Sequence, residues 1–263
     1  PYPTPTPMPT PTKTPRPTST PNAWSYYNKG EEYLDAENWE MAVSEYAKAI
    51  GVNPNYIDAY FYRAYSYAEL DQHQTAINDY TKVIQLDLDY SKAYNNRGLS
   101  YDELGQYQTA INDYTKAIQL DPDDANAYNN RGISYRNLGQ YQTAINDYTK
   151  AIQLDPDYVI AYLMRGIAYG ILDQHELAIS DTSMAIELDL DYSFAYNVRG
   201  NSYYMLGQYQ AAITDTSKAI QLDPDDATAY NNRGSSYRGL GQHQNAIADY
   251  TKAIQLDPDY AVA

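Results

Sequence analysis

Six arginines and six aspartates recur along the chain at one interval, and these charged side chains are the first candidates for chemistry. The arginines are 34 residues apart, and an aspartate follows each of them after 16 residues. The two series are Arg63, Arg97, Arg131, Arg165, Arg199 and Arg233, and Asp79, Asp113, Asp147, Asp181, Asp215 and Asp249. A row of guanidinium groups could bind an anionic ligand. Because an unpaired buried charge is costly, the parallel carboxylates favour a ladder of internal ion pairs instead.

Residues that commonly carry catalysis do not gather in this sequence. Cysteine is absent, which excludes thiolate metal sites, cysteine nucleophiles and disulfides. The histidines stand where Trp or Tyr stands in other copies of the same unit, so we interpret them as aromatic fillers; they are His73, His175 and His243. Acidic turns such as residues 121–124 could hold Ca²⁺, but they lack the glycine-pivoted loop of a calcium site, and helix capping is favoured. The sequence predicts no enzyme, no cofactor and no metal.

The charged series belong to a unit of two short helices. Between residues 125 and 158, apolar and aromatic residues recur every three or four positions from Tyr128 to Leu138 and again from Tyr141 to Leu154. This spacing predicts two amphipathic helices. Gly139 lies between them, where a helix commonly ends in a left-handed residue. Gly132 and Ala144 are small, which indicates that the two helices cross closely at these positions.

Aromatic and small residues, followed by a proline, occupy fixed positions in most of these units. One set is Tyr94, Gly98, Tyr101, Ala110, Tyr114, Ala117 and Pro122. The pattern resembles the tetratricopeptide repeat family, although Tyr replaces the usual Trp and Phe and Arg replaces the usual Leu before the glycine. Seven copies fill residues 23–260, with boundaries 23–56, 57–90, 91–124, 125–158, 159–192, 193–226 and 227–260. The resemblance implies an all-α fold, an α-solenoid in which helix-turn-helix hairpins stack into a right-handed superhelix, and a non-enzymatic scaffold for protein-protein interaction.

The charge of the chain restricts its partners. The net charge is −16, and all 34 acidic residues lie in the repeats. A nucleic acid would be repelled by such an array, so no nucleic-acid partner is expected. No apolar run approaches the length of a membrane span, so no membrane insertion is expected. The acidic surface either keeps the protein soluble or attracts a basic partner, and the sequence leaves both readings open.

Residues 1–22 differ from the repeats, because nine prolines and seven threonines nearly alternate there. Such a segment predicts an extended polyproline-II-like tail that reaches roughly 68 Å at ~3.1 Å per residue. Similar segments form stalks of secreted and cell-wall proteins, so we expect a secreted or cell-surface protein of a bacterium. The tail then offers possible O-glycosylation sites at Thr4, Thr6, Thr10, Thr12, Thr14, Thr18 and Thr20. The first residue is not Met, which suggests a removed signal segment or a longer gene product.

Asparagines lie along the first helix of most repeats. In the resembled family, this helix lines the inner groove. The asparagines are Asn28, Asn95, Asn96, Asn129, Asn130, Asn197, Asn231 and Asn232. A side-chain amide both donates and accepts hydrogen bonds, so a row of amides could hold an extended peptide backbone. The row resembles the asparagine ladder of the O-GlcNAc transferase superhelix. The alternative is a solvated surface without a specific ligand.

Repeats 5 and 6 interrupt this polar row with large apolar residues. The predicted apolar groove patch consists of Ile160, Leu163, Ile167, Phe194 and Tyr204. An apolar patch in a polar groove is typical of a contact site. The alternative is additional packing between neighbouring first helices.

The last repeat is followed by residues 261–263, which would begin an eighth unit. The second helix of repeat 7 would then expose Ile247, Tyr250 and Ile254, and we interpret these residues as a subunit joint. End-to-end stacking that does not close makes a filament. We therefore predict that the protein assembles head to tail into a fibre, with residues 1–22 docked on a neighbouring subunit. The alternative is a monomeric cell-surface adaptor that binds an extended peptide of another protein in its groove.

Overall fold

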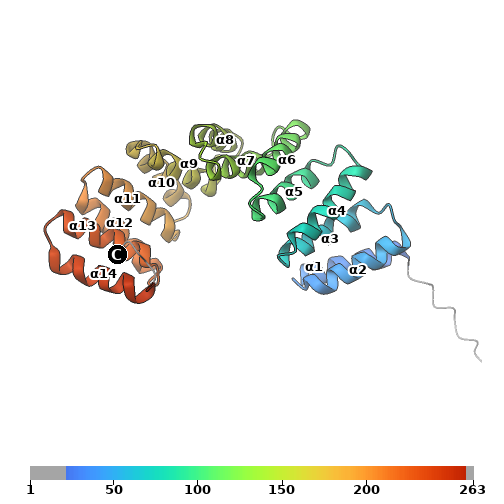
Figure 1. The fold of residues 1–263 in the computed structure, drawn as a ribbon, viewed down its shortest axis with the longest axis horizontal. Helices are drawn as coiled ribbons and strands as arrows, with labels where there is room; N and C mark the ends of the chain where they lie inside the picture. The colour runs from blue at the N-terminus through green and yellow to red at the C-terminus, as the bar shows by residue number, and fades with distance from the viewer. Residues whose placement is uncertain (1–21, 259–263) are drawn as a thin grey trace, which may run out of the picture.

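The chain folds into a curved array of antiparallel helix pairs, which form an arch in Figure 1. The computed structural model describes residues 22–258. In this range the helices are α1 (Ala23–Asp35), α2 (Trp39–Val52), α3 (Ile57–Glu69), α4 (His73–Leu86), α5 (Ser91–Glu103), α6 (Tyr107–Leu120), α7 (Ala125–Asn137), α8 (Tyr141–Leu154), α9 (Val159–Ile171), α10 (His175–Leu188), α11 (Ser193–Met205), α12 (Tyr209–Leu222), α13 (Ala227–Gly239) and α14 (His243–Leu256). The predicted all-α solenoid is confirmed.

The two helices of each pair are joined by a short turn that needs a left-handed residue. Gly139 has a φ of +73°, as predicted for the end of the first helix. Glycine fills this place in repeats 3, 4, 6 and 7. In repeats 1, 2 and 5 it is replaced by Glu37, Asp71 and Asp173, whose φ angles are 53°, 57° and 57°. A Cβ atom is unfavourable in this conformation, so these three turns store strain.

Glycine should relieve that strain in the first turn. We expect Glu37→Gly to raise the free energy of unfolding by about 1 kcal/mol, because the residue is exposed and only its backbone conformation changes in cost. The reverse substitution, Gly139→Ala, should lower it by a similar amount. Urea denaturation followed by circular dichroism measures both variants. An unchanged denaturation midpoint for Glu37→Gly would show that the turn carries no strain.

The contact inside each hairpin is a glycine against a buried ring. A methyl group on Gly132 would lie 2.7 Å from the Tyr148 ring, and one on Gly98 would lie 2.7 Å from the Tyr114 ring. Both tyrosines are completely buried. The small residue is therefore required for the close approach of the two helices, as the sequence indicates. In repeat 5 the ring is replaced by Thr182, which packs against Gly166 in the same way.

Each of the six arginines joins the two helices of its own repeat. Arg131 donates from Nε to Asp147 Oδ2 and from Nη2 to Asp147 Oδ1, both at 2.8 Å. The same bidentate pair occurs in repeats 2 to 7, so the predicted ladder is confirmed. Repeat 1 replaces it with Lys29 and the buried Glu45, 3.3 Å apart. These pairs connect the first helix of a hairpin to the second.

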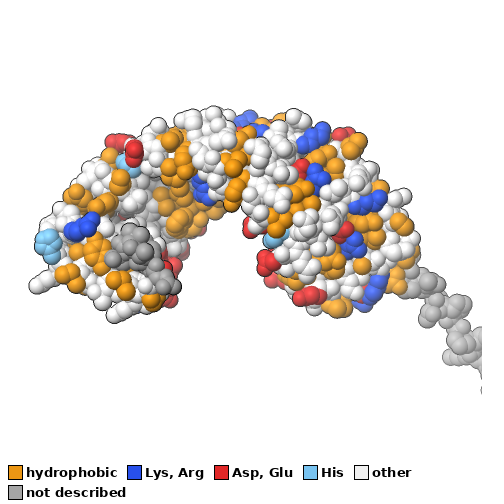
Figure 2. Space-filling model, in the orientation of Figure 1, with side chains coloured by type: hydrophobic (Ala, Val, Ile, Leu, Met, Phe, Trp, Pro, Cys, Tyr) orange, Lys and Arg blue, Asp and Glu red, His pale blue; other side chains and the backbone are white. Residues whose placement is uncertain are grey.

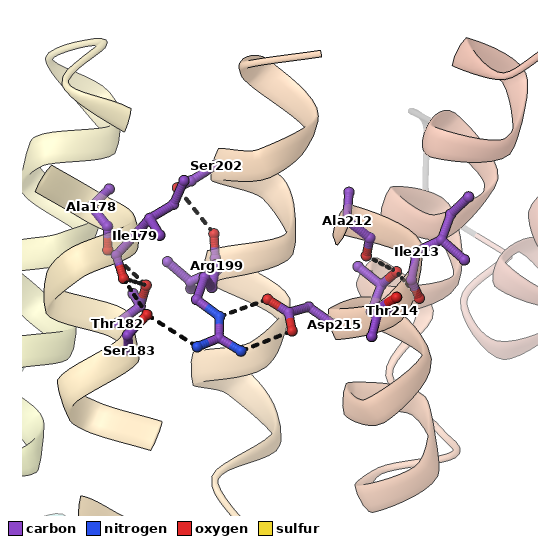
Figure 3. A network of polar contacts seen from close by, with 12 residues as sticks. Ala178, Ile179, Thr182, Ser183, Arg199, Ser202, Ala212, Ile213, Thr214 and Asp215 are labelled. Atoms are coloured by element: carbon purple, nitrogen blue, oxygen red, sulfur yellow. Dashed lines mark hydrogen bonds and ion pairs between the residues drawn. The ribbon is translucent and has the colours of Figure 1, made fainter. Parts of the chain in front are cut away.

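Five of these arginines also reach back to the preceding repeat. Figure 3 shows Arg199, which binds Asp215 and also donates from Nη1 to Ser183 Oγ at 3.0 Å. The equivalent bonds go from Arg97, Arg131, Arg165 and Arg233 to Thr81, Thr115, Thr149 and Ser217. Arg63 has no such bond, because the equivalent residue of repeat 1 is Ala47. The ladder therefore holds neighbouring repeats together from repeat 2 onward.

The first helices of the hairpins form the inner side of the arch. From α3 to α13, each odd-numbered helix contacts the next odd-numbered helix, whereas no comparable contacts join successive even-numbered helices. Helices on the inner side of a curved stack are closer together than those on the outer side. The inner, concave face therefore consists of α1, α3, α5, α7, α9, α11 and α13.

Candidate functional site

The concave face has an open pocket between α9 and α11. Its volume is about 390 Å³. The lining residues are Gly166, Ile167, Gly170, Ile171, Phe194, Asn197, Val198, Asn201, Ser202, Thr228 and Asn232. In Figure 2 hydrophobic side chains gather on the inner side of the arch near these helices. Two of the five residues of the predicted apolar groove patch, Ile167 and Phe194, line this pocket.

One of the other members, Leu163, is contradicted by its burial, and the remaining two lie outside this pocket, so their role stays a prediction. Leu163 is 0% exposed and belongs to the core between α9 and α10, because its side chain points between the helices rather than into the groove. The ring of Tyr204 packs against Tyr209, with ring centres 5.7 Å apart, and lies outside the pocket lining. Ile160 is exposed but also lies outside it. The pocket instead includes Ile171 and Val198.

The asparagine row also differs from the expectation, because half of it is buried. Asn95, Asn129, Asn197 and Asn231 are between 3% and 9% exposed. Two of these side chains accept hydrogen bonds from the following repeat: Asn130 Nδ2 donates to Asn95 Oδ1 at 3.2 Å, and Asn232 Nδ2 donates to Asn197 Oδ1 at 2.8 Å. The Asn95 and Asn197 oxygens therefore stabilise the stacking of first helices, whereas Asn129 Oδ1 and Asn231 Oδ1 are buried and have no hydrogen-bond partner in residues 22–258. Burial leaves these four amides little surface with which to hold a peptide backbone.

The other four asparagines are partly exposed on the inner helices, and their predicted role in peptide binding stays a prediction. They are Asn28, Asn96, Asn130 and Asn232. Asn96 and Asn130 line an open pocket beside Asp121 and Asp124, and Asn232 lines the apolar pocket. Fewer asparagines are therefore exposed in the groove than the sequence indicates.

The N-terminal part of the concave face has a different character. A pocket of about 380 Å³ between α3 and α5 is lined by Tyr65, Ala68, Glu69, Asp71, His73, Tyr80, Asn96, Leu99, Ser100 and Glu103. The next pocket, about 420 Å³ between α5 and α7, includes Asp102 and Glu103. Figure 2 shows carboxylates along the inner edge of this arm. The pockets of the concave face are thus mainly acidic from α3 to α7, where Lys92 also lines one of them, and apolar in repeats 5 and 6.

Asp102 is the carboxylate of this region with the most hydrogen bonds. Tyr114 Oη donates to Asp102 Oδ2 at 2.8 Å, and Ser134 Oγ of the following repeat donates to Asp102 Oδ1 at 2.7 Å. Burial raises the pKa of the Asp102 carboxyl, although the bonds from Ser134 and Tyr114 oppose the rise. The ionised group therefore costs stability in the folded protein at neutral pH.

This raised pKa leads to a pH-dependent prediction. A carboxyl with a raised folded-state pKa binds protons more tightly in the folded state, so the wild type gains stability as the pH falls through that pKa. We expect Asp102→Asn to be more stable than the wild type at pH 7, and the difference to shrink at pH 4. Urea denaturation at both pH values tests this, with Asp157→Asn as control, because Asp157 is exposed and lies in another repeat. An advantage of Asp102→Asn that grows toward pH 4 would contradict the argument.

The side of α14 that corresponds to the covered side of earlier second helices carries the predicted subunit joint. Ile247 is 64% exposed, whereas Ile145 at the same position of repeat 4 is 4% exposed, because the helix pair that follows repeat 4 covers it. Ile254 is also exposed, and Tyr250 is partly buried with its hydroxyl 3.2 Å from Ser235 Oγ. The joint itself stays a prediction. Residues 1–21, with the seven threonines of the predicted O-glycosylation sites, and residues 259–263 lie outside the described residues.

Catalytic, metal-binding and membrane-spanning features have little support in residues 22–258. His73, His175 and His243 each begin a second helix, so they lie in separate repeats. Asp124 and Asp226 accept hydrogen bonds from the first amides of α7 and α13, which confirms helix capping at these acidic turns. Within the described range, no three His, Cys, Asp or Glu side chains are placed to share a metal ion. None of the helices of this range has the length and apolarity that a membrane crossing requires.

The fold and the concave face define a class of protein: an α-solenoid of stacked helical hairpins, whose first helices form an inner groove. Tetratricopeptide repeat models match residues 91–124, 125–158 and 227–260, residues 147–180 and residues 27–91, and a TPR repeat model matches residues 200–241. The chain belongs to the tetratricopeptide repeat family. As a member of this family it is a non-enzymatic scaffold for protein-protein interaction.

Solved structures give the same result. MamA is 28% identical with a TM-score of 0.57, and the match covers 63% of this chain and 97% of MamA. YrrB, described as a TPR protein with an unusual peptide-binding site, is 25% identical with a TM-score of 0.59, over 70% of this chain and 94% of YrrB. A tetratricopeptide repeat protein from Parabacteroides merdae is 21% identical with a TM-score of 0.71, over 91% and 95%, and supports the fold alone. No curated protein matches the sequence.

Proposed function

We propose that the protein is an adaptor that binds an extended segment of a partner protein along its concave face. The observation that carries this proposal is the apolar surface of α9 and α11 on that face, where Ile171 and Phe194 are nearly half exposed and line the pocket. Exposed apolar side chains in a concave, otherwise polar surface are typical of a protein-binding site. The likeness to YrrB, which has a peptide-binding site, supports the same reading.

Photo-crosslinking tests this proposal. A photoreactive amino acid at Phe194 in the full chain, mixed with a random 16-residue peptide library, should cross-link to peptides. The same amino acid at the exposed Gln108 of α6, on the outer side of the array, is the control and should cross-link rarely. Equal cross-linking at both positions would count against a binding groove.

Head-to-tail assembly is a second candidate function, favoured by the uncovered side of α14. Ile247 and Ile254 are exposed there, and in the interior of the array a following first helix covers the same positions. In this proposal a second copy supplies that helix, and residues 1–22 dock on the neighbouring subunit. Light scattering of the full chain should show a mass that grows with concentration, and Ile247→Asp should reduce it. A monomer mass that stays constant with concentration would contradict fibre assembly.

The location outside the cell is also a proposal, supported by the alternation of Pro and Thr in residues 1–22. Glycans on the seven threonines would belong to the same proposal. Intact-mass measurement of the protein purified from its source tests both, because each hexose adds a fixed increment. An unmodified mass in a cytoplasmic fraction would contradict this part.

A further inference from the structure

The pocket between α9 and α11 has a glycine, Gly170, at a position where every other repeat has a side chain. The residues at the position of Gly170 in the other repeats are Leu34, Ala68, Asp102, Arg136, Tyr204 and Arg238. A methyl group on Gly170 would meet nothing closer than the Ala178 Cβ, at 4.0 Å. Unlike Gly132, Gly170 is therefore not required by a close helix crossing. Its effect is to leave space on the concave face.

The walls of this space suit an aliphatic side chain. Ile167 and Ile171 of α9 lie on one side, and Phe194 and Val198 of α11 lie on the other. Removing an aliphatic side chain from water in such a pocket is favourable in proportion to its apolar area. Asn201 is exposed at the same pocket, and its amide can donate to and accept from a peptide group beside the buried side chain.

The equivalent pocket three repeats earlier has the opposite chemistry. In place of Ile171 it has Glu69, and Glu103 faces it from α5. Neither glutamate has a lysine or arginine ion-pair partner within residues 22–258. The whole chain carries a net charge of −16. A basic ligand is therefore attracted to the N-terminal part of the groove, and an acidic one is repelled.

We propose that the groove binds an extended, basic peptide of another protein that places one aliphatic side chain in the Gly170 pocket. The lysine or arginine residues of this peptide lie toward the acidic pockets of repeats 2 to 4. This assignment rests on the proposed adaptor function and names the chemistry of its ligand. The apolar pocket supplies specificity for one side chain, and the carboxylates supply charge complementarity.

Selection from a random 16-residue peptide library with the full chain at low salt provides the probe. We expect the selected peptides to share a Leu, Ile, Val or Met and to be enriched in Lys and Arg. Gly170→Tyr, which copies Tyr204 of the next repeat without changing charge, should weaken binding of a selected peptide by about tenfold or more. Its thermal stability should stay equal or rise, because glycine is a poor helix residue.

A matched control separates filling of the pocket from a general effect of the substitution. Gly51 is also the second-last residue of a helix, is exposed and has no atom within 4 Å of an added methyl group. Gly51→Tyr should therefore bind the selected peptide like the wild type. Replacing the basic residues of that peptide by Glu should weaken binding by about tenfold or more, and so should raising the salt concentration.

The outcomes distinguish this inference from the function on which it rests. If no library peptide binds, the adaptor function itself is wrong. If peptides bind but Gly170→Tyr and Gly51→Tyr behave alike, the groove binds peptides and the pocket assignment is overturned. Selected peptides that are acidic overturn the charge assignment. A synthetic peptide of residues 1–22 that binds at this pocket more tightly than any selected peptide overturns the assignment to another protein.

Discussion

Asp147→Ala is expected to lower the free energy of unfolding by about 3–5 kcal/mol, because it leaves a buried guanidinium without its partner. Asp147 is 6% exposed and accepts two hydrogen bonds from Arg131. Burial alone would lower the pKa of Arg131, and the hydrogen bonds and charge of Asp147 outweigh it and raise that pKa. Urea denaturation followed by circular dichroism measures the loss.

The same substitution at an exposed acid of the same repeat is the control. Asp157→Ala should change the free energy of unfolding by less than about 0.5 kcal/mol. Replacing both partners, as Arg131→Met with Asp147→Leu, should recover much of the lost stability, because no buried charge then remains. If Asp147→Ala were as mild as Asp157→Ala, the ladder would contribute nothing to stability.

Tyr114→Ala should cost about 3–5 kcal/mol, because it leaves a cavity between the helices of repeat 3. The ring is completely buried and rests on Gly98, which has no side chain to fill the space. Thermal and urea denaturation give the free energy. A loss below 1 kcal/mol would mean that α5 and α6 collapse onto each other without the ring.

Two phenylalanine variants divide this effect between the ring and the hydroxyl. Tyr114→Phe should cost about 1 kcal/mol, because the hydroxyl donates to Asp102. Tyr148→Phe should be nearly neutral, because the Tyr148 hydroxyl has no hydrogen-bond partner within residues 22–258. Equal values for the two variants would show that the bond to Asp102 is not stabilising.

Much of the fold can be predicted from the sequence because the residues that set each turn, helix crossing and ion pair recur every 34 residues. Gly139 in the turn, Gly132 at the crossing and the pairing of Arg131 with Asp147 are each predicted from residue type and spacing, and each is confirmed. These features depend on contacts within one hairpin. Their partners lie at a fixed separation in the sequence, so spacing alone identifies them.

The candidate site was harder to predict, because it depends on contacts between hairpins. Asn129 and Asn130 are adjacent and chemically identical, yet only Asn129 is buried. Residue type alone suggested that both were exposed. Leu163 occupies the same buried position in repeat 5. The prediction that it lines the groove is wrong for the same reason. Comparison of the repeats does not resolve this, because the position holds asparagine in four of them and Tyr27, Phe61 or Leu163 in the others.

Gly170 is absent from the predicted site residues for a different reason. A search for side chains that do chemistry passes over a glycine, since its contribution is the space that its neighbours leave open. The signal lay in the repeat alignment, where most other repeats have a longer residue such as Arg136 or Tyr204 at this position.

Among the repeats described in residues 22–258, the joint between repeats 1 and 2 lacks the cross-repeat arginine bond, and this has a mechanical consequence. Aromatic rings meet across this joint instead: Tyr46 stacks near Tyr62 and Tyr27 packs edge-on against the same ring, each with ring centres 6.2 Å apart. Ring contacts tolerate several geometries, whereas the single bond from an arginine Nη1 to a hydroxyl at the other joints requires one distance and direction. When the array bends, the joint between repeats 1 and 2 is therefore expected to deform most easily. A load applied through the N-terminal segment would then be absorbed by tilting of repeat 1, while the curvature that shapes the groove of repeats 2 to 6 is kept.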